Sequence, residues 1–87
     1  MKLINAMESI VIHAFDEFKK NHTFKCSCEK CELDILALTL NKLTPKYVSS
    51  DQGEVLVKAF FHDTQLQHDI IREIALATMT VENNPRH

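Results

Sequence analysis

Residues 31–43, CELDILALTLNKL, decide the fold of this 87-residue chain. Their helical pattern is apolar almost all the way round, at Leu33, Ile35, Leu36, Ala37, Leu38, Leu40 and Leu43. A helix without a polar face is buried on every side, but a domain of this size buries only about two-thirds of the surface that its unfolded chain exposes. We therefore expect the helix to pack against its own subunit and against a second copy, in a homodimer. It should end before Thr44, because a residue that precedes proline disfavours the α region.

The residues before this stretch predict another helix. Within LINAMESIVIHAFDEFKK, residues 3–20, an apolar stripe recurs at helical spacing, at Ile4, Met7, Val11, Ala14, Phe15 and Phe18. This pattern is typical of an amphipathic helix with one buried face. It should end near Lys20, where lysines favour the carbonyl end of a helix and Asn21 interrupts it.

The residues after Leu43 predict an extended piece and then a return to helix. In TPKYVSSDQGE, residues 44–54, Asp51 and Glu54 have the spacing of a capping box, and Ser50 is an alternative cap. From there to about Glu82 the apolar pattern is helical again. Asp63 or Thr64 could cap a second helix within this range, so the pattern leaves open whether it forms one helix or two.

The composition favours helices over strands. The chain has one glycine and two prolines, which is too few turn formers for an all-β fold. We expect a single all-α domain over residues 1–87, with three to four helices, that forms an intertwined or antiparallel homodimer.

Charge and hydropathy exclude several classes of protein. The net charge is −2 and no basic block stands out, so direct DNA binding is not expected. No apolar run approaches the length of a membrane span. Residues 1–18 carry Glu8, Asp16 and Glu17 and lack a small-residue cleavage site, so they do not read as a secretory signal. Together with an odd number of cysteines, this favours the reducing cytoplasm.

The only three cysteines, Cys26, Cys28 and Cys31, lie within six positions. This spacing suits a structural zinc ion, which takes four thiolate or imidazole ligands in a tetrahedron. His22 is the best local fourth ligand; a water or a group of the partner chain are alternatives, and His13, His62, His68 and His87 qualify only if the fold brings them near. A redox dithiol at Cys28 and Cys31, or three uncoordinated thiols, are the competing interpretations. We expect no enzymatic activity, because three thiolates leave a metal electron-rich and no general base is evident.

Four blocks in order carry a resemblance to a known family: NAMESIV (5–11), CSCEKCELDILALTLNKLTPKYV (26–48), SSDQGE (49–54) and ENNPRH (82–87). Together they resemble the ComFB family of late competence development proteins over nearly the full chain. Thr44 departs from this family, which often carries a second proline there, and three cysteines exclude a four-thiolate site within one subunit. The resemblance implies an all-α symmetric homodimer with zinc on the clustered cysteines, an association with natural competence, and binding of cyclic di-GMP or cyclic di-AMP.

A cyclic dinucleotide needs cations and donors for its phosphates and a flat surface for its bases. The stretch PKYVSSDQG, residues 45–53, offers Lys46 for charge, Tyr47 for stacking, Ser49 and Ser50 for hydrogen bonds, and Gly53 for close approach. The competing interpretations are a half-buried core tyrosine, a solvated lysine and serines that only cap a helix. The alternative function is a zinc-stabilised dimeric adaptor that binds a protein and no small molecule; a redox switch at the cysteines is a third.

Overall fold

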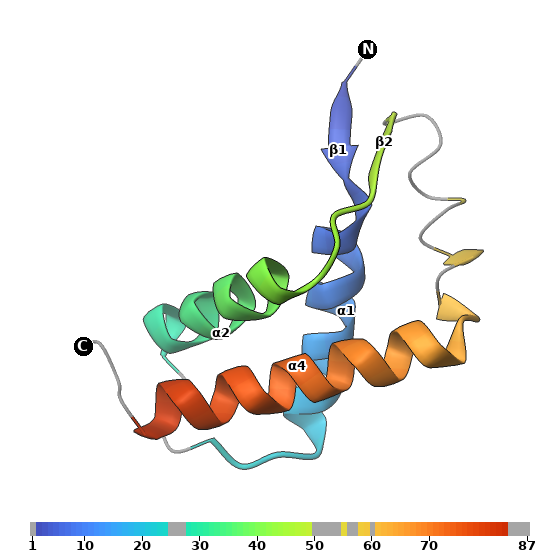
Figure 1. Cartoon of the computed structure of the whole chain (residues 1–87). Coiled ribbons are helices and arrows are strands. Elements are labelled where there is room, and N and C mark those ends of the chain that lie inside the picture. The colour runs from blue at the N-terminus through green and yellow to red at the C-terminus, as the bar shows by residue number, and fades with distance from the viewer. Residues whose placement is uncertain (1, 25–27, 50–54, 56–57, 60, 84–87) are drawn as a thin grey trace.

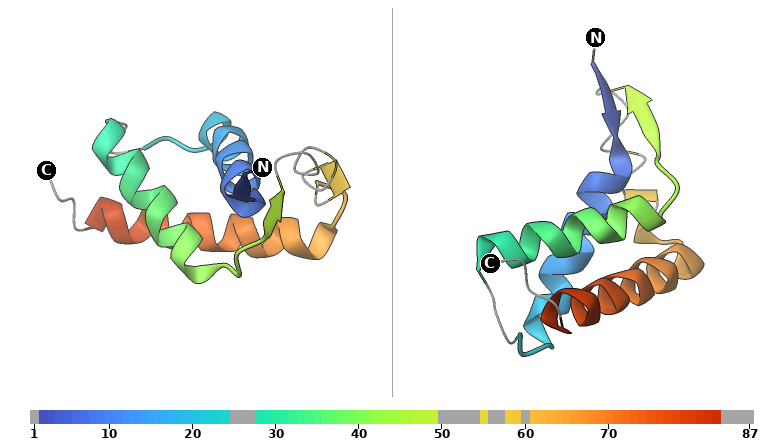
Figure 2. Two further views of the ribbon diagram at one scale, coloured as in Figure 1. Left: turned by 90° about the horizontal axis from the view of Figure 1, so that it is seen from above. Right: turned by 60° about the vertical axis from the view of Figure 1, so that its left-hand side comes forward.

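The computed structural model describes residues 2–24, 28–49, 55, 58–59 and 61–83, and these are mostly helical. The helices with defined bounds are α1 (Ala6–Lys20), α2 (Glu29–Lys42) and α4 (Thr64–Asn83), and two short strands are β1 (Leu3–Asn5) and β2 (Tyr47–Ser49). In Figures 1 and 2, α2 crosses α4 in roughly the opposite direction, and α1 packs across both. The start of α2 therefore lies at the same end of the molecule as the end of α4 (Figure 1).

Helix α1 confirms the predicted amphipathic helix but begins at Ala6, two residues after Ile4, the first residue of the apolar stripe. Asn5 is its N-cap, and the side-chain oxygen accepts a hydrogen bond from the backbone N–H of Met7. The buried face consists of Ala6, Met7, Ile10, Val11 and Phe15. The helix ends at Lys20 as expected, and the N–H of Asn21 donates to the Phe18 carbonyl.

The strands correct the all-α prediction. Residues 3–5 pair antiparallel with residues 47–49, in the register Leu3 with Ser49, Ile4 with Val48 and Asn5 with Tyr47. The extended piece after residue 44 is confirmed, whereas its pairing with the N-terminal residues was not predicted. Leu3 and Ile4 continue the apolar stripe of α1, so their periodicity alone places them in the helix. Their backbone partners are residues 47–49, which follow α2 in the sequence.

Helix α2 was expected to be buried on every side, and within one chain this is wrong. Its buried residues are Cys31, Ile35 and Thr39, which follow one another at i, i+4 spacing and face α4 and α1. Leu33 remains 57% exposed, and Ala37 is exposed as well. The helix begins at Glu29, two residues before the predicted stretch, and ends at Lys42, before Thr44 as predicted.

A break precedes helix α4 and answers whether residues 54–82 form one helix or two, which the sequence pattern did not decide. Residues 55, 58, 59 and 61 are helical, His62 is in a turn, and Asp63 accepts a hydrogen bond of 3.1 Å from the backbone N–H of Leu66. The segment therefore contains two helices, with Asp63 capping the second. The predicted caps Asp51, Glu54 and Ser50 lie outside the described residues.

The core lies where the three helices meet. The buried face of α4 consists of Ile70, Ile74, Ala77, Thr78 and Val81. Two polar residues among those described are fully buried, and both are satisfied within their own helices. The Thr39 hydroxyl donates a 2.8 Å hydrogen bond to the Ile35 carbonyl, and the Thr78 hydroxyl donates one of 2.8 Å to the Ile74 carbonyl. Of the described helices, none has the length and apolar character needed to cross a membrane.

Candidate functional site

The described cysteines lie at the beginning of α2. Cys28 is the N-cap residue and is exposed, and Cys31 is buried in the first turn. The positive end of the helix dipole favours the thiolate form that binds metals. Within the described residues no three His, Cys, Asp or Glu side chains come close enough to hold a metal ion, so Cys28, Cys31 and His22 do not make such a set by themselves. Cys26 lies outside the described residues, and the zinc site stays a prediction.

His22 packs in an aromatic cluster next to α4. Its ring stacks on Phe18 with centroids 5.1 Å apart and forms a T-shaped pair with Phe24, with centroids 4.6 Å apart. Its Nε2 atom is 3.7 Å from Oε2 of Glu82, near the end of α4. The imidazole therefore has a carboxylate neighbour that sequence reasoning did not foresee. The other candidate histidines, His13, His62 and His68, are exposed, and His87 lies outside the described residues.

Lys46 lines a pocket of about 310 Å³ between the end of α2, the link to β2 and the first half of α4. Two more cations line it, Lys42 at the end of α2 and Arg72 on α4. The carboxylates of Asp69 and Glu73 lie on the α4 side. The remaining lining residues are Met7, Leu43, Thr44 and Leu66. With three cations against two carboxylates, the described lining has a formal net charge of +1.

The acidic lining residues are already engaged with neighbours on α4. Arg72 Nη2 lies 3.5 Å from Glu73 Oε2, and Gln65 Nε2 donates a 3.0 Å hydrogen bond to Asp69 Oδ1. Both contacts are exposed, so each is weak and exchangeable. An anion that enters the pocket can therefore compete for Arg72 at small cost.

The backbone of Lys46 is fixed by the start of α1. Its carbonyl accepts a 2.6 Å hydrogen bond from the N–H of Ala6, and its N–H donates a 2.8 Å hydrogen bond to the side-chain oxygen of Asn5. Sequence reasoning found Lys46 but missed Asn5, Lys42 and Arg72. An asparagine near the start of a helical stripe can signal a cap, but nothing in the pattern shows its second bond to residue 46.

The other predicted ligand residues do not join Lys46 in this pocket. Tyr47 and Ser49 belong to β2 and are absent from the described lining, and Tyr47 is 62% exposed. Successive side chains of a strand point to opposite faces, so Tyr47 and Ser49 share the face of β2 opposite to Val48. Ser50 and Gly53 lie outside the described residues. Of the predicted ligand residues, Lys46 alone among those described contacts this pocket.

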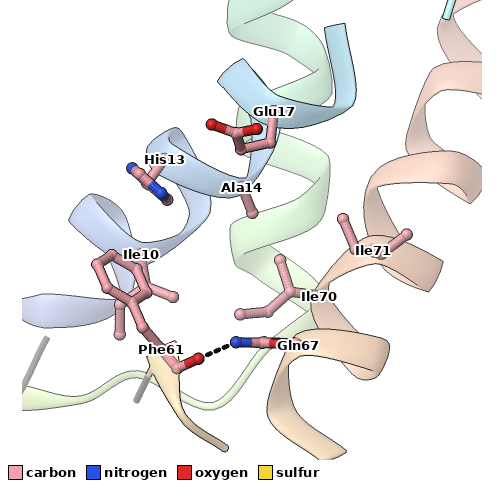
Figure 3. A pocket seen from close by; sticks show the side chains of 8 residues that line it. All are labelled: Ile10, His13, Ala14, Glu17, Phe61, Gln67, Ile70 and Ile71. Carbon is pink, nitrogen blue, oxygen red and sulfur yellow. Dashed lines mark hydrogen bonds between the residues drawn. The ribbon is translucent and has the colours of Figure 1, made fainter. Parts of the chain in front are cut away.

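A second pocket, of about 360 Å³, lies between α1, α4 and Phe61 (Figure 3). Its apolar walls are formed by Ile10, Ala14, Phe61, Ile70 and Ile71, and its polar lining by His13, Glu17 and Gln67. The His13 and Phe61 rings are 4.6 Å apart, and Gln67 Nε2 donates to the Phe61 carbonyl. Without a lysine or arginine among its described lining, this pocket is poorly suited to a phosphate.

Comparison with known proteins confirms the resemblance seen in the sequence. The family described as late competence development protein ComFB matches residues 4–85. Competence protein ComFB of Bacillus subtilis (strain 168) is 29% identical over 83 residues, which cover 95% of this chain and 85% of that protein. A solved structure of the late competence protein ComFB from Bacillus subtilis matches with a TM-score of 0.84 and 28% identity, over 97% of this chain and 92% of that one. The chain therefore belongs to the ComFB family of late competence development proteins.

Proposed function

We propose that this chain is a non-enzymatic regulatory protein of the ComFB family, a zinc-stapled homodimer that binds cyclic di-GMP or cyclic di-AMP and acts in a pathway linked to natural competence. The observation that carries the ligand proposal is the convergence of Lys46, Lys42 and Arg72 on one pocket. The sequence predicts Lys46 for its charge, and the fold adds Lys42, four positions earlier, and Arg72 from α4.

The pocket has the chemistry that a phosphodiester requires. Arginine can bind two phosphate oxygens at once through its planar fork, whereas lysine acts as a mobile point charge. Asp69 and Glu73 accept hydrogen bonds, which suits the amino groups of a purine base. The volume lies near the lower end of the range of about 300–1,000 Å³ for ligand pockets. One pocket would therefore hold half of a cyclic dinucleotide, and a symmetric homodimer would offer a second pocket to the other half.

The homodimer proposal is supported by the outer face of α2. Leu33, Leu36, Ala37 and Leu40 form a stripe at i, i+3, i+4, i+7 spacing. Leu33 and Ala37 are exposed, and Leu36 and Leu40 are only partly buried against the chain's own core. Contiguous apolar surface of this kind marks interfaces between proteins. A second copy that covers the stripe would complete the burial that the sequence predicts for this helix.

The zinc proposal is supported by the placement of two thiols at the N-terminus of α2. Cys28 is the N-cap of α2, and Cys31 lies three positions later in its first turn. With Cys26 two positions before Cys28 in the sequence, the cluster has enough thiolates for three ligands. A metal there would fix the loop between α1 and α2 to the start of α2.

Lys46→Ala is expected to weaken binding of the cyclic dinucleotide by about tenfold to hundredfold. This range corresponds to the loss of a hydrogen bond to a charged group, about 1.5–3 kcal/mol. Isothermal titration calorimetry with cyclic di-GMP and cyclic di-AMP measures it. Lys30→Ala is the matched control, because Lys30 is exposed in the first turn of α2 and does not line the pocket. Equal affinity in the two variants would remove Lys46 from the site.

The alternative proposal is a dimeric adaptor without a small-molecule ligand. The apolar second pocket and the exposed Leu76 and Met79 of α4 favour it, because they offer surface to a protein partner. The same titration discriminates the two functions: an adaptor binds neither nucleotide.

A further inference from the structure

We propose that Asn5 is a positioning residue of the ligand pocket, which holds the backbone of Lys46 so that its ammonium group is aimed at the phosphate. The inference rests on the proposed function and adds to it a residue that lies outside the pocket lining. It starts from the side-chain oxygen of Asn5, which accepts hydrogen bonds from two backbone N–H groups at once. One belongs to Met7, at 3.1 Å, and the other to Lys46, at 2.8 Å and 41 positions away in sequence.

The contacts around Asn5 leave Lys46 little backbone freedom. The N–H of Ala6 holds the Lys46 carbonyl at 2.6 Å, while Asn5 holds its N–H. Asn5 is also paired with Tyr47 in the sheet, so the residue after Lys46 is fixed as well. Pro45, on the other side, has a fixed φ. Both polar backbone groups of Lys46 therefore depend on residues 5 and 6.

The same contacts tie Lys46 to a wall of the pocket. Met7, which donates to Asn5, is 1% exposed and lines the pocket that Lys46 lines. Asn5 therefore connects the start of α1 with Lys46. Without this contact, the Lys46 side chain would move with the exposed link between α2 and β2. Holding a charged side chain in place before the ligand arrives reduces the entropy lost on binding.

The two roles of Asn5 need different side-chain lengths, which makes them separable. Serine is as good an N-cap as asparagine, but its oxygen is one bond closer to the backbone and serves its own helix only. Aspartate keeps an acceptor in the position of the asparagine carbonyl oxygen. Asn5→Ser should therefore keep the cap and lose the bond to Lys46, and Asn5→Asp should keep both.

The experiment measures the affinity for the cyclic dinucleotide, the melting temperature and the hydrogen exchange of the Lys46 amide in the wild type and these variants. We expect Asn5→Ser to bind about tenfold more weakly and to lose protection of the Lys46 amide, since exchange reports local opening. Its melting temperature should fall by about 4–8 °C, because one hydrogen bond contributes about 1 kcal/mol to a domain of this size. Asn5→Asp should bind within about threefold of the wild type. Val81→Ala is the stability control: it thins the buried face at the far end of α4, and should lower the melting temperature without changing affinity.

Each outcome decides the matter. Wild-type affinity in Asn5→Ser would overturn the role of Asn5 and leave the proposed function standing. Weak binding in both Asn5→Ser and Val81→Ala would also overturn it, because affinity would then only follow stability. If the wild-type protein binds neither nucleotide, the proposed function is overturned and the role of Asn5 in it falls too, while exchange at Lys46 still reports whether the hydrogen bond exists.

Discussion

Cys28→Ser is expected to unfold the domain or to lower its melting temperature by tens of degrees. Structural zinc contributes on the order of 10 kcal/mol in small zinc-finger peptides, and a whole domain is stable by only about 5–15 kcal/mol. Removing one thiolate ligand should therefore remove most of the stability of an 87-residue chain. Circular dichroism melts of the variant and of chelator-treated wild type should agree, and metal analysis should find zinc in the wild type alone.

Because of the position of Cys28, the direction of the stability change in Cys28→Ser shows whether its thiol binds a metal. Cys28 is the N-cap residue of α2 and is exposed. If its thiol bound no metal, serine at this position would be neutral or stabilising, since serine is among the best N-caps. A stabilised Cys28→Ser variant would therefore contradict the zinc proposal. Reversible oxidation of the wild type with a change in stability, but without bound metal, would favour the redox interpretation instead.

Leu33→Asp is expected to convert the protein from a dimer to a monomer. Leu33 is 57% exposed on the outer stripe of α2, so the substitution costs the isolated chain little. In a dimer that covers this stripe, the new carboxylate would be buried without a partner, which costs several kcal/mol. Sedimentation equilibrium at micromolar concentration should give the 10.0 kDa mass of one chain for the variant and twice that for the wild type.

Leu76→Asp is the matched control for this experiment. Leu76 is 51% exposed on α4, so the two variants differ in the helix that they modify and not in chemistry. Loss of the dimer in Leu76→Asp alone would place the interface on α4. A wild-type protein that sediments as one chain would contradict the homodimer.

The helices were predictable from the sequence because each carries its own periodic pattern. The stripe from Met7 to Phe18 and the end of α2 before Thr44 needed only local information. The strand at Leu3–Asn5 was not predictable, because Leu3 and Ile4 fit the helical stripe and their true partners are residues 47–49. The exposed side of α2 was missed for a related reason: a pattern shows that a face is apolar but not what covers it.

The candidate site was predictable in the same limited way. Lys46 stood out because it supplies the positive charge of the stretch PKYVSSDQG. Lys42 and Arg72 carry no such signal, since one ends a helix and the other is an ordinary surface residue of α4, and only the tertiary fold joins them. The cysteine cluster was predictable from its spacing in the sequence. The carboxylate beside His22 was not, because the packing of α4 places Glu82 there.

The bond between Asn5 and Lys46 has a consequence for the order of folding. It closes a loop of 41 residues that contains α1 and α2, and closing a loop of that length costs about 3 kcal/mol of chain entropy. Helices need only near neighbours, so they should form first and the sheet last. In stopped-flow refolding, far-ultraviolet dichroism should recover before nucleotide binding does, and simultaneous recovery would contradict this order. The earliest folding intermediates would then be helical chains that do not yet bind the nucleotide.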